Sequence, residues 1–279
     1  MKRQTMMAFF AILICIAYML FSGCTSSSAP DIRAMNFTTI TPGKLSVATG
    51  TSYPPFVWIN TSESDPQARY TGFEIDLMRE IAKELNCPVE FTSQPFSAII
   101  TAIQAKQYDC AIDSLSITGD RQTKVSFSDP YYYIQQSILA RADDNSITDP
   151  SDLAAKNKTV VASPASTGMD LARNGLGIKQ ENIKTYGHIR DAIPELKIGA
   201  VDAIVMDYPT ARSYYDAYPG SFKFVGQPFP QKEPYGIIAN KENTKLIAAI
   251  NLALAKIRAD GRYGNLLNKY HLENMSASP

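Results

Sequence analysis

The sequence predicts an α/β protein with two halves, each a mostly parallel β-sheet flanked by helices. Strand-like and helix-like segments alternate from residue 44 to residue 114, an order that gives parallel sheets covered on both faces. A second series of this kind begins near residue 158. Short polar or glycine-bearing segments follow strands in both series. Because ligands bind at the carboxyl ends of strands in open α/β sheets, we expect one binding cleft between the halves.

The N-terminal region precedes the predicted fold. Residues 1–24 combine two basic residues with a long apolar run that ends in small residues before Cys24, a pattern typical of an export signal. The ending resembles a lipobox, in which the cysteine becomes lipidated. A retained membrane anchor with an incidental Cys24 is the alternative. Both interpretations place the rest of the chain outside the cytoplasmic membrane, and the Ser-rich residues 25–43 are predicted to be a flexible tether.

In the first half, three predicted strands alternate with two predicted helices. The strands are the apolar or β-branched runs at residues 44–49, 88–93 and 109–114. The helices are residues 74–85 and 96–107, in which apolar residues recur at helical spacing. Glu74 and Asp76 lie in the first turn of the first helix, where the helix dipole favours negative charge.

The second half repeats the alternation and ends in helices. Its predicted strands are residues 158–163, 202–207 and 234–240, with residues 222–229 leading out of this half. Its predicted helices are residues 167–174, 189–199, 208–219, 244–261 and 263–271. Pro194 interrupts the second of these helices.

Composition excludes several classes of function. The 27 Lys and Arg residues balance the 27 Asp and Glu residues, so the net charge of zero provides no attraction to nucleic acid. The two histidines lie far apart, so no metal site or cofactor is predicted. Cys87 and Cys110 lie beside strand-like runs and are predicted to be buried thiols rather than a disulfide. The sequence lacks the nucleophile-elbow and phosphate-loop signatures, which points away from the commoner enzymes.

Arg121 is the strongest candidate for binding an anion. It follows the short hydroxyl side chains of Ser114 and Ser116 in the loop after a predicted strand. A guanidinium matches a carboxylate in a bidentate geometry, and hydroxyls beside it can complete the hydrogen bonds. The alternative is a surface arginine that pairs with Asp120 or Asp129.

Two other strand ends carry candidate binding groups. Asp207 ends a predicted strand, where its carboxylate can accept an ammonium group; the alternative, favoured by the local sequence, is an N-cap for the helix at Pro209. Ser166 and Thr167 precede a helix whose free N–H groups attract a carboxylate. Ser166 as a plain N-cap is equally plausible. A positive and a negative anchor together fit the zwitterion of an amino acid.

Several segments resemble one known family. Residues 72–85 look like the signature of the extracellular solute-binding proteins of family 3, the polar amino acid receptors of ABC importers. The segments YPPF, SLSITGDRQ, FSDPYY, MDYPTA and DGRYGNLLNKY resemble further family blocks in the family's order. The resemblance covers residues 44–272. It implies a two-lobe, periplasmic-binding-protein-like fold of type II with a hinge, in which lobe 1 is 44–134 with 234–279 and lobe 2 is 135–233.

The resemblance also implies roles for individual residues. Arg121 matches the arginine that holds the ligand's α-carboxylate, and Asp207 matches the aspartate that takes the α-ammonium, which overturns the cap interpretation. Further matches are a hydroxyl beside the arginine, a hydroxyl pair from lobe 2 and two aromatic walls: Ser116, Ser166, Thr167, Tyr53 and Phe96.

The implied function is that of an extracytoplasmic substrate-binding component of an ABC importer, without a cofactor or catalytic residues. It would act as a monomer, anchored in the periplasm or at the cell surface through lipidated Cys24, and would bind a free polar or cationic amino acid for a membrane permease. Two alternatives remain open. One is a dehydratase on the same scaffold, and the other is a sensor that signals to a membrane partner.

The chain departs from the family pattern at two positions. Gly50 stands where receptors for basic amino acids have an aspartate that reaches the ligand's side chain. Asp113 stands where family members mostly have a small residue. If Asp113 points into the cleft, it favours a cationic or hydrogen-bond-donating side chain; if it faces the hinge or pairs locally, the pocket is merely polar.

Overall fold

The structure, a computed structural model, describes residues 32 and 35–275. These residues belong to one compact unit. The predicted export signal, Cys24 and most of the predicted tether lie outside them. Within the part of the chain that the structure describes, no helix combines the length and apolar character needed to cross a membrane.

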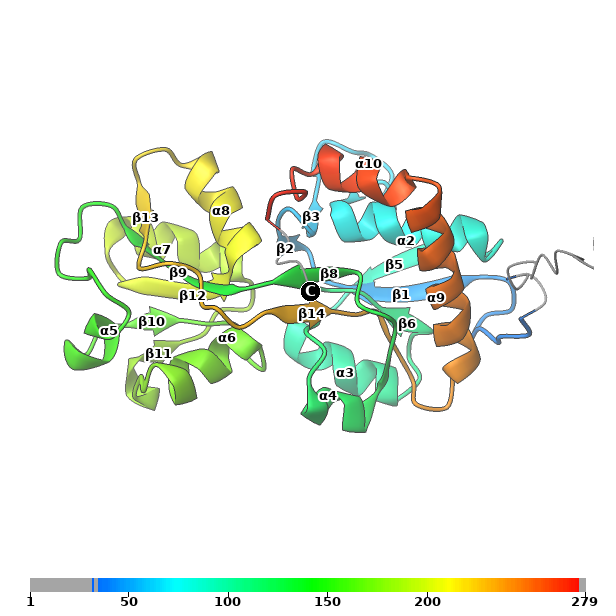
Figure 1. Cartoon of the computed structure of the whole chain (residues 1–279), viewed down its shortest axis with the longest axis horizontal. Helices are drawn as coiled ribbons and strands as arrows, with labels where there is room; N and C mark the ends of the chain where they lie inside the picture. Colours follow the sequence, from blue (N-terminus) through cyan, green and yellow to red (C-terminus); the bar gives the residue numbers. More distant parts are fainter. Residues whose placement is uncertain (1–31, 33–34, 276–279) are drawn as a thin grey trace, which may run out of the picture. The chain divides into compact units, whose positions relative to one another are not determined.

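The first five-stranded sheet has the order β5-β1-β6-β15-β7 (Figure 1). Its strands are β1 (Leu45–Thr49), β5 (Val89–Ser93), β6 (Cys110–Ala111), β7 (Ser126–Phe127) and β15 (Ile238–Ala239). Strand β1 runs parallel to β5 and β6, whereas β15 runs antiparallel to β6 and β7. We call this sheet, with its helices and the small sheet described below, lobe 1.

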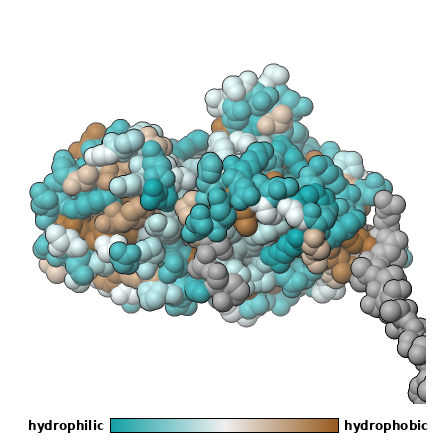
Figure 2. Space-filling view, turned by 45° about the horizontal axis from the view of Figure 1, so that its top comes forward, coloured by the Kyte–Doolittle hydropathy of each residue, from teal (hydrophilic) through white to brown (hydrophobic). Residues whose placement is uncertain are grey.

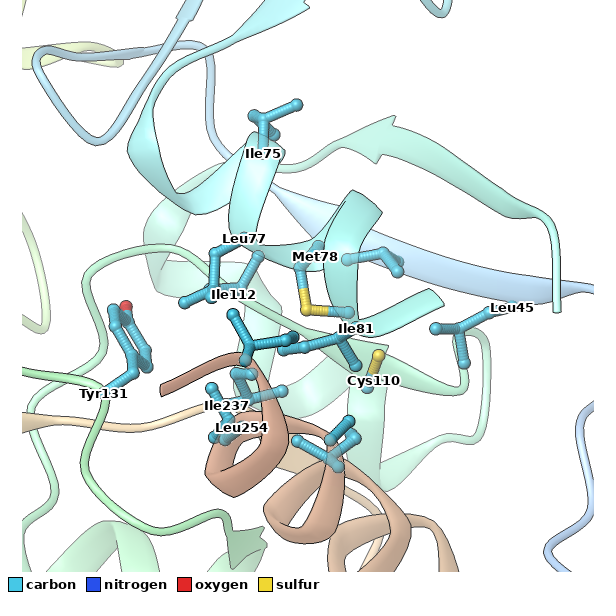
Figure 3. Close-up of a cluster of buried hydrophobic side chains, with 14 of the residues drawn as sticks. Leu45, Ile75, Leu77, Met78, Ile81, Cys110, Ile112, Tyr131, Ile237 and Leu254 are labelled. Atoms are coloured by element: carbon cyan, nitrogen blue, oxygen red, sulfur yellow. The ribbon is translucent and has the colours of Figure 1, made fainter. Parts of the chain in front are cut away.

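Alternate residues of the first sheet pack against helices on opposite faces, as the period of two in a strand requires. Val47 and Cys110 belong to a core cluster that includes α2 (Phe73–Glu84) and α9 (Thr244–Ala259), with α10 (Arg262–Lys269) at its edge. Their neighbours Ala48 and Ala111 belong to a second cluster with α3 (Phe96–Gln104) and with Val125, which follows α4 (Gly119–Lys124). Figure 3 shows the first cluster, where Met78 and Ile81 of α2 approach Cys110.

The second five-stranded sheet has the order β11-β10-β12-β9-β13. Its strands are β9 (Gln136–Arg141), β10 (Val160–Val161), β11 (Ile183–Lys184), β12 (Ala203–Asp207) and β13 (Phe222–Phe224). Strand β10 runs parallel to β11 and β12, whereas β9 runs antiparallel to β12 and β13. The helices of this part are α5 (Asp152–Ala155), α6 (Thr167–Asp170), α7 (Ala192–Ile198) and α8 (Tyr208–Ala217). We call this sheet with its helices lobe 2.

Two short sheets complete the fold. Strands β8 (Tyr132–Ile134) and β14 (Glu233–Tyr235) pair antiparallel where the chain passes between the lobes (Figure 1). Strands β2 (Ser52–Tyr53), β3 (Val57–Ile59) and β4 (Tyr70–Thr71) form a small antiparallel sheet in lobe 1. The predicted two-lobe α/β class is confirmed. Each large sheet is mixed, however, because its two parallel pairings are joined by two antiparallel ones.

Most predicted elements are present, with informative exceptions. Strand β9 and the small sheet were not predicted. Helix α7 begins at Ala192 after a 3₁₀ turn at Ile189–Asp191, so Pro194 lies in the first helical turn, where its missing N–H costs nothing. Both described cysteines are free and buried, as predicted. The face in Figure 2 is largely hydrophilic.

Gly72 fixes where α2 begins. It occupies the N-cap position with φ 126° and ψ 168°, a conformation that is costly for other residues. A Cβ atom at this position would lie 2.1 Å from the backbone oxygen of Phe56. The close contact holds the first turn of α2, which carries Glu74, against the small sheet.

We expect Gly72→Ala to destabilise the protein by at least about 2 kcal/mol, because it combines backbone strain with a clash against main chain. Urea unfolding followed by circular dichroism measures the change. Gly119→Ala is the matched control, because a Cβ atom at the first residue of α4 meets no atom within 4 Å. Equal unfolding free energies for the two variants would contradict the role of Gly72 at the start of α2.

Candidate functional site

A cavity of about 160 Å³ lies where the loops of the two lobes meet. The residues that line it follow five of the six strands that take part in parallel pairing, β1, β5, β6, β10 and β11, and form the end of the sixth, β12. The contributing segments include residues 50–53, 94–97, 113–114, 163–164, 186–189 and 205–207. The expectation of a cleft at the carboxyl ends of the strands therefore agrees with the geometry.

All of the candidate binding residues line this cavity. They are Tyr53, Phe96, Asp113, Ser114, Ser116, Arg121, Ser166, Thr167 and Asp207. Other aromatic residues near them in the sequence lie elsewhere. Phe56 packs in the core against Tyr132 and Tyr235, and Trp58 packs against Tyr270.

Arg121 presents a buried guanidinium to the cavity. Its side chain is only 6% exposed and lies over the ring of Phe96, with its central carbon 5.4 Å from the ring centroid. Its Nη1 donates to the backbone oxygen of Ser116 at 2.8 Å, and its Nη2 donates to that of Ala165 in lobe 2 at 2.9 Å. A guanidinium has five N–H groups, so three remain for an anion.

The alternative for Arg121, a surface pair with a neighbouring aspartate, is wrong. Asp120 pairs instead with Lys124 at 2.7 Å. Thr118 caps α4 by accepting a hydrogen bond from the backbone nitrogen of Arg121. The cap fixes the turn that aims the guanidinium inward.

The predicted hydroxyl ligands Ser114 and Ser116 hold carboxyl groups. The Ser116 hydroxyl donates to Oε2 of Glu233 at 2.8 Å, and the Ser114 hydroxyl donates to Oε1 of Glu74 at 3.0 Å. Because a serine hydroxyl has one proton, neither hydroxyl has a proton left for an anion in this arrangement. The two hydrogen bonds instead hold in place the loop that carries Arg121.

Asp207 accepts hydrogen bonds from two distant elements. The Nε2 atom of Gln136 donates to its Oδ1 atom, and the Tyr235 hydroxyl donates to its Oδ2 atom. Its backbone nitrogen donates to the hydroxyl of Tyr53 at 3.1 Å. Burial, reinforced by the charge of Glu233, raises the pKa of Asp207 to about 6. The cap interpretation is wrong, because Asp207 precedes α8 but makes no side-chain cap hydrogen bond.

Ser166 and Thr167 have different roles at the start of α6. The Ser166 hydroxyl caps the helix by accepting from the backbone nitrogen of Met169 at 3.0 Å. Thr167 accepts from Nε2 of Gln136 at 3.1 Å. The plain-cap alternative for Ser166 is therefore what the structure shows, although both side chains line the cavity.

Gln136 is a cavity residue that sequence reasoning missed. Its amide nitrogen bridges Thr167 and Asp207, and its buried Oε1 atom has no hydrogen-bond partner. A polar residue at the start of an apolar strand was the available signal. His188 and Ser52 were also missed; both line the cavity, with Nδ1 of His188 and Oγ of Ser52 3.2 Å apart.

Asp113 and Glu74 place two buried carboxyl groups at the base of the lobe 1 wall. Asp113 lines the cavity, is 4% exposed and accepts a hydrogen bond from the backbone of Gly50. Glu74 is fully buried, and its Oε1 atom accepts from the backbone nitrogen of Ser114 and the hydroxyl of Tyr131. Burial raises the pKa of Glu74 to about 7, and burial together with Glu74 raises the pKa of Asp113.

Several hydrogen bonds join the lobes around the cavity, and four of them are the following. Two are those of Arg121 with Ala165 and of Asp207 with Tyr53. The others are between Ser52 and His188 and between the Tyr214 hydroxyl and the backbone oxygen of Ser52, at 3.4 Å. Among the described residues, no three His, Cys, Asp or Glu side chains are placed to hold a metal ion.

Comparisons with known proteins agree on one family. Residues 45–273 match the model for bacterial extracellular solute-binding proteins, family 3. The arginine-binding periplasmic protein of Mannheimia haemolytica is 31% identical over 224 residues, which are 78% of this chain and 87% of that protein. An ancestral arginine-binding protein solved with arginine is similar at a TM-score of 0.73 and 35% identity, over 82% of this chain and 98% of that chain. An ancestral amino acid-binding protein, a precursor of cyclohexadienyl dehydratase, is similar at a TM-score of 0.71 and 32% identity, over 82% and 95% of the two chains.

The raised pKa of Glu74 predicts a pH dependence of stability. A carboxyl whose pKa is higher in the folded state than in the unfolded state binds its proton more tightly when folded, so the unfolding free energy falls as pH rises from about 4.5 to about 7. We expect Glu74→Gln, which keeps an acceptor for Ser114 and Tyr131, to remove up to about 3 kcal/mol of this fall.

Urea unfolding at several pH values measures how the unfolding free energy changes with pH. Glu242→Gln is the control, because Glu242 pairs with Lys106 at an exposed site and its pKa is lowered rather than raised. If the unfolding free energy of Glu74→Gln changes with pH as that of the wild type does, Glu74 is already ionised at low pH.

Proposed function

Because the chain belongs to the bacterial extracellular solute-binding proteins of family 3, we propose that it binds a free amino acid between its lobes and supplies it to an ABC importer. Names of relatives such as the arginine-binding periplasmic protein support a receptor for an amino acid. They also support a location outside the cytoplasmic membrane. Anchoring through lipidated Cys24, monomeric action and a permease partner are parts of the same proposal.

One observation carries the proposal. A buried cation, Arg121 of lobe 1, and a buried carboxyl, Asp207 of lobe 2, line the same cavity. Three free N–H groups of the guanidinium can take an α-carboxylate. Asp207 can take an α-ammonium, because a carboxylate oxygen accepts more than one hydrogen bond. Phe96 and Tyr53 supply aromatic surface beside these groups.

The positions of the two charged groups connect binding to movement. A ligand held by both Arg121 and Asp207 adds contacts between lobes that already share hydrogen bonds. Such contacts exist only when the lobes are together, so the ligand shifts the population towards the closed form. We place the lobe limits at 44–134 with 234–279 and at 135–233. The crossings between these segments would form the hinge, and the permease would recognise the closed form.

A dehydratase is the second candidate function. Asp113 favours it, because a buried carboxyl with a raised pKa that lines a cavity is the kind of group that acts as a general acid. Incubation with arogenate and prephenate, followed by mass spectrometry, separates the two functions. We expect both compounds to be recovered intact, and products that have lost water would establish the enzyme.

We expect Arg121→Ala to weaken amino acid binding by about 2–5 kcal/mol, because it leaves the ligand's carboxylate unpaired in a buried site. The measurement is a thermal-shift panel of L-amino acids on the full chain, refolded to remove bound ligand. Ligand at about a hundred times its Kd stabilises the wild type by roughly 2.7 kcal/mol, which is readily detected.

Two further variants control this experiment. Arg121→Lys keeps the charge but loses the planar fork, so we expect intermediate binding. Arg212→Ala removes an exposed ion pair with Asp216 on α8 and should leave binding unchanged. If folded Arg121→Ala binds the amino acid with full affinity, Arg121 does not bind the ligand.

A further inference from the structure

Asp113 is a cavity carboxyl without a countercharge in the protein. It is buried and lines the cavity, yet it forms no salt bridge with any residue that the structure describes. It accepts a hydrogen bond from the backbone of Gly50. A carboxylate in this position needs an ion or strong donors to offset the loss of hydration.

The charges around the cavity do not balance. Among the residues that line it, Arg121 is the sole lysine or arginine, whereas Asp113 and Asp207 supply two carboxyls. An amino acid whose α-carboxylate meets Arg121 and whose α-ammonium meets Asp207 leaves Asp113 unmatched. Glu74 and Glu233 lie behind the wall and add negative charge near Asp113 and Asp207, respectively. The missing charge is therefore positive.

Gly50 provides the space that Asp113 occupies. A Cβ atom at residue 50 would lie 2.5 Å from Oδ1 and 3.0 Å from Oδ2 of Asp113. Any side chain at residue 50 would therefore overlap the carboxyl. Gly50 also lines the cavity, so the carboxyl lies against bare backbone at the cavity wall.

We propose that Asp113, seated in the space left by Gly50, is the subsite for the ligand's side chain and selects a cationic group, an ammonium or a guanidinium. This assignment rests on the proposed function, because it requires Arg121 and Asp207 to hold the α-groups. It deepens that function by naming cationic amino acids as the ligand class.

The proton on Asp113 provides an independent signature. Burial and the nearby Glu74 of α2 raise the pKa of Asp113, while the Gly50 N–H after β1 lowers it; the Tyr131 hydroxyl, close to both carboxyls, donates to Glu74. A bound cation favours the carboxylate, so binding releases a proton and affinity rises with pH. A neutral side chain has no such effect on Asp113, and any proton that the α-ammonium displaces from Asp207 is common to both kinds of ligand.

The test compares arginine with citrulline, which has the same length and no charge. Isothermal titration calorimetry on the refolded full chain gives both affinities, and buffers of different ionisation enthalpy give the protons released. We expect the wild type to prefer arginine by at least about thirtyfold and to release more protons with arginine than with citrulline. Asp113→Asn should reduce the preference to about threefold or less and abolish the difference in proton release between the two ligands.

Two more variants keep the test independent of folding defects. Gly50→Ala should reduce the preference for arginine, because its methyl group displaces the Asp113 carboxyl. Asp143→Asn removes one negative charge at an 85% exposed side chain that is not among the lining residues, and it should keep the wild-type preference.

The outcomes separate this inference from the proposed function. Arg121-dependent binding of amino acids with no preference for arginine over citrulline would overturn the cationic subsite alone. A preference retained in Asp113→Asn would do the same. Absence of binding by every amino acid would overturn both.

Discussion

Carboxyl groups removed from water impose the constraint on which the cavity depends. Glu74, Asp113 and Asp207 are all buried, and a buried carboxyl is tolerated only with hydrogen-bond donors around it. Two of the three are held by neutral donors from distant segments: Ser114 and Tyr131 at Glu74, Gln136 and Tyr235 at Asp207. These bonds set the positions of the loops, because each loop must bring its donor to a carboxyl. The guanidinium of Arg121 is held in place by loops fixed in this way.

The mixed sheets follow from how the chain crosses between the lobes. Segments β7–β8–β9 and β13–β14–β15 pair antiparallel in three successive places: β7 with β15, β8 with β14 and β9 with β13. Two extended segments therefore run side by side from the edge of one sheet to the edge of the other (Figure 1). The antiparallel strands of each lobe are the ends of this ribbon, while the parallel strands supply the cavity loops. Movement of one lobe against the other must bend the ribbon.

The sequence was informative where residue type and position after a strand decide the outcome. Arg121 and Asp207 could be singled out because each is a charged residue just beyond an apolar run. Roles that depend on distant partners could not be found. The local sequence favoured Asp207 as a helix cap, but Tyr235 and Gln136 take its oxygens. Glu74 was identified only as an acidic residue that the helix dipole favours, yet it is fully buried and accepts a hydrogen bond from the backbone nitrogen of Ser114.

Strand β9 shows a second limit of sequence reasoning. Five of its six residues are buried, so the sequence lacks the alternation that marks a half-exposed strand, and short apolar runs are ambiguous. Ser114 and Ser116, predicted as binding residues, line the cavity. Their hydrogen bonds to Glu74 and Glu233 could not be predicted from the sequence, because these partners lie 40 and 117 residues away along the chain.

The contact between Gly50 and Asp113 has an evolutionary consequence. Because a side chain at residue 50 and a carboxyl at residue 113 need the same space, the two positions are epistatic. A lineage that acquires an acidic residue at position 50 while Asp113 is present meets a steric barrier and a second buried charge. Replacement of Asp113 by a smaller residue removes both, so the order of substitutions that begins with it is the less costly one. The order of substitutions at these two sites is thus constrained by the shape of the cavity wall.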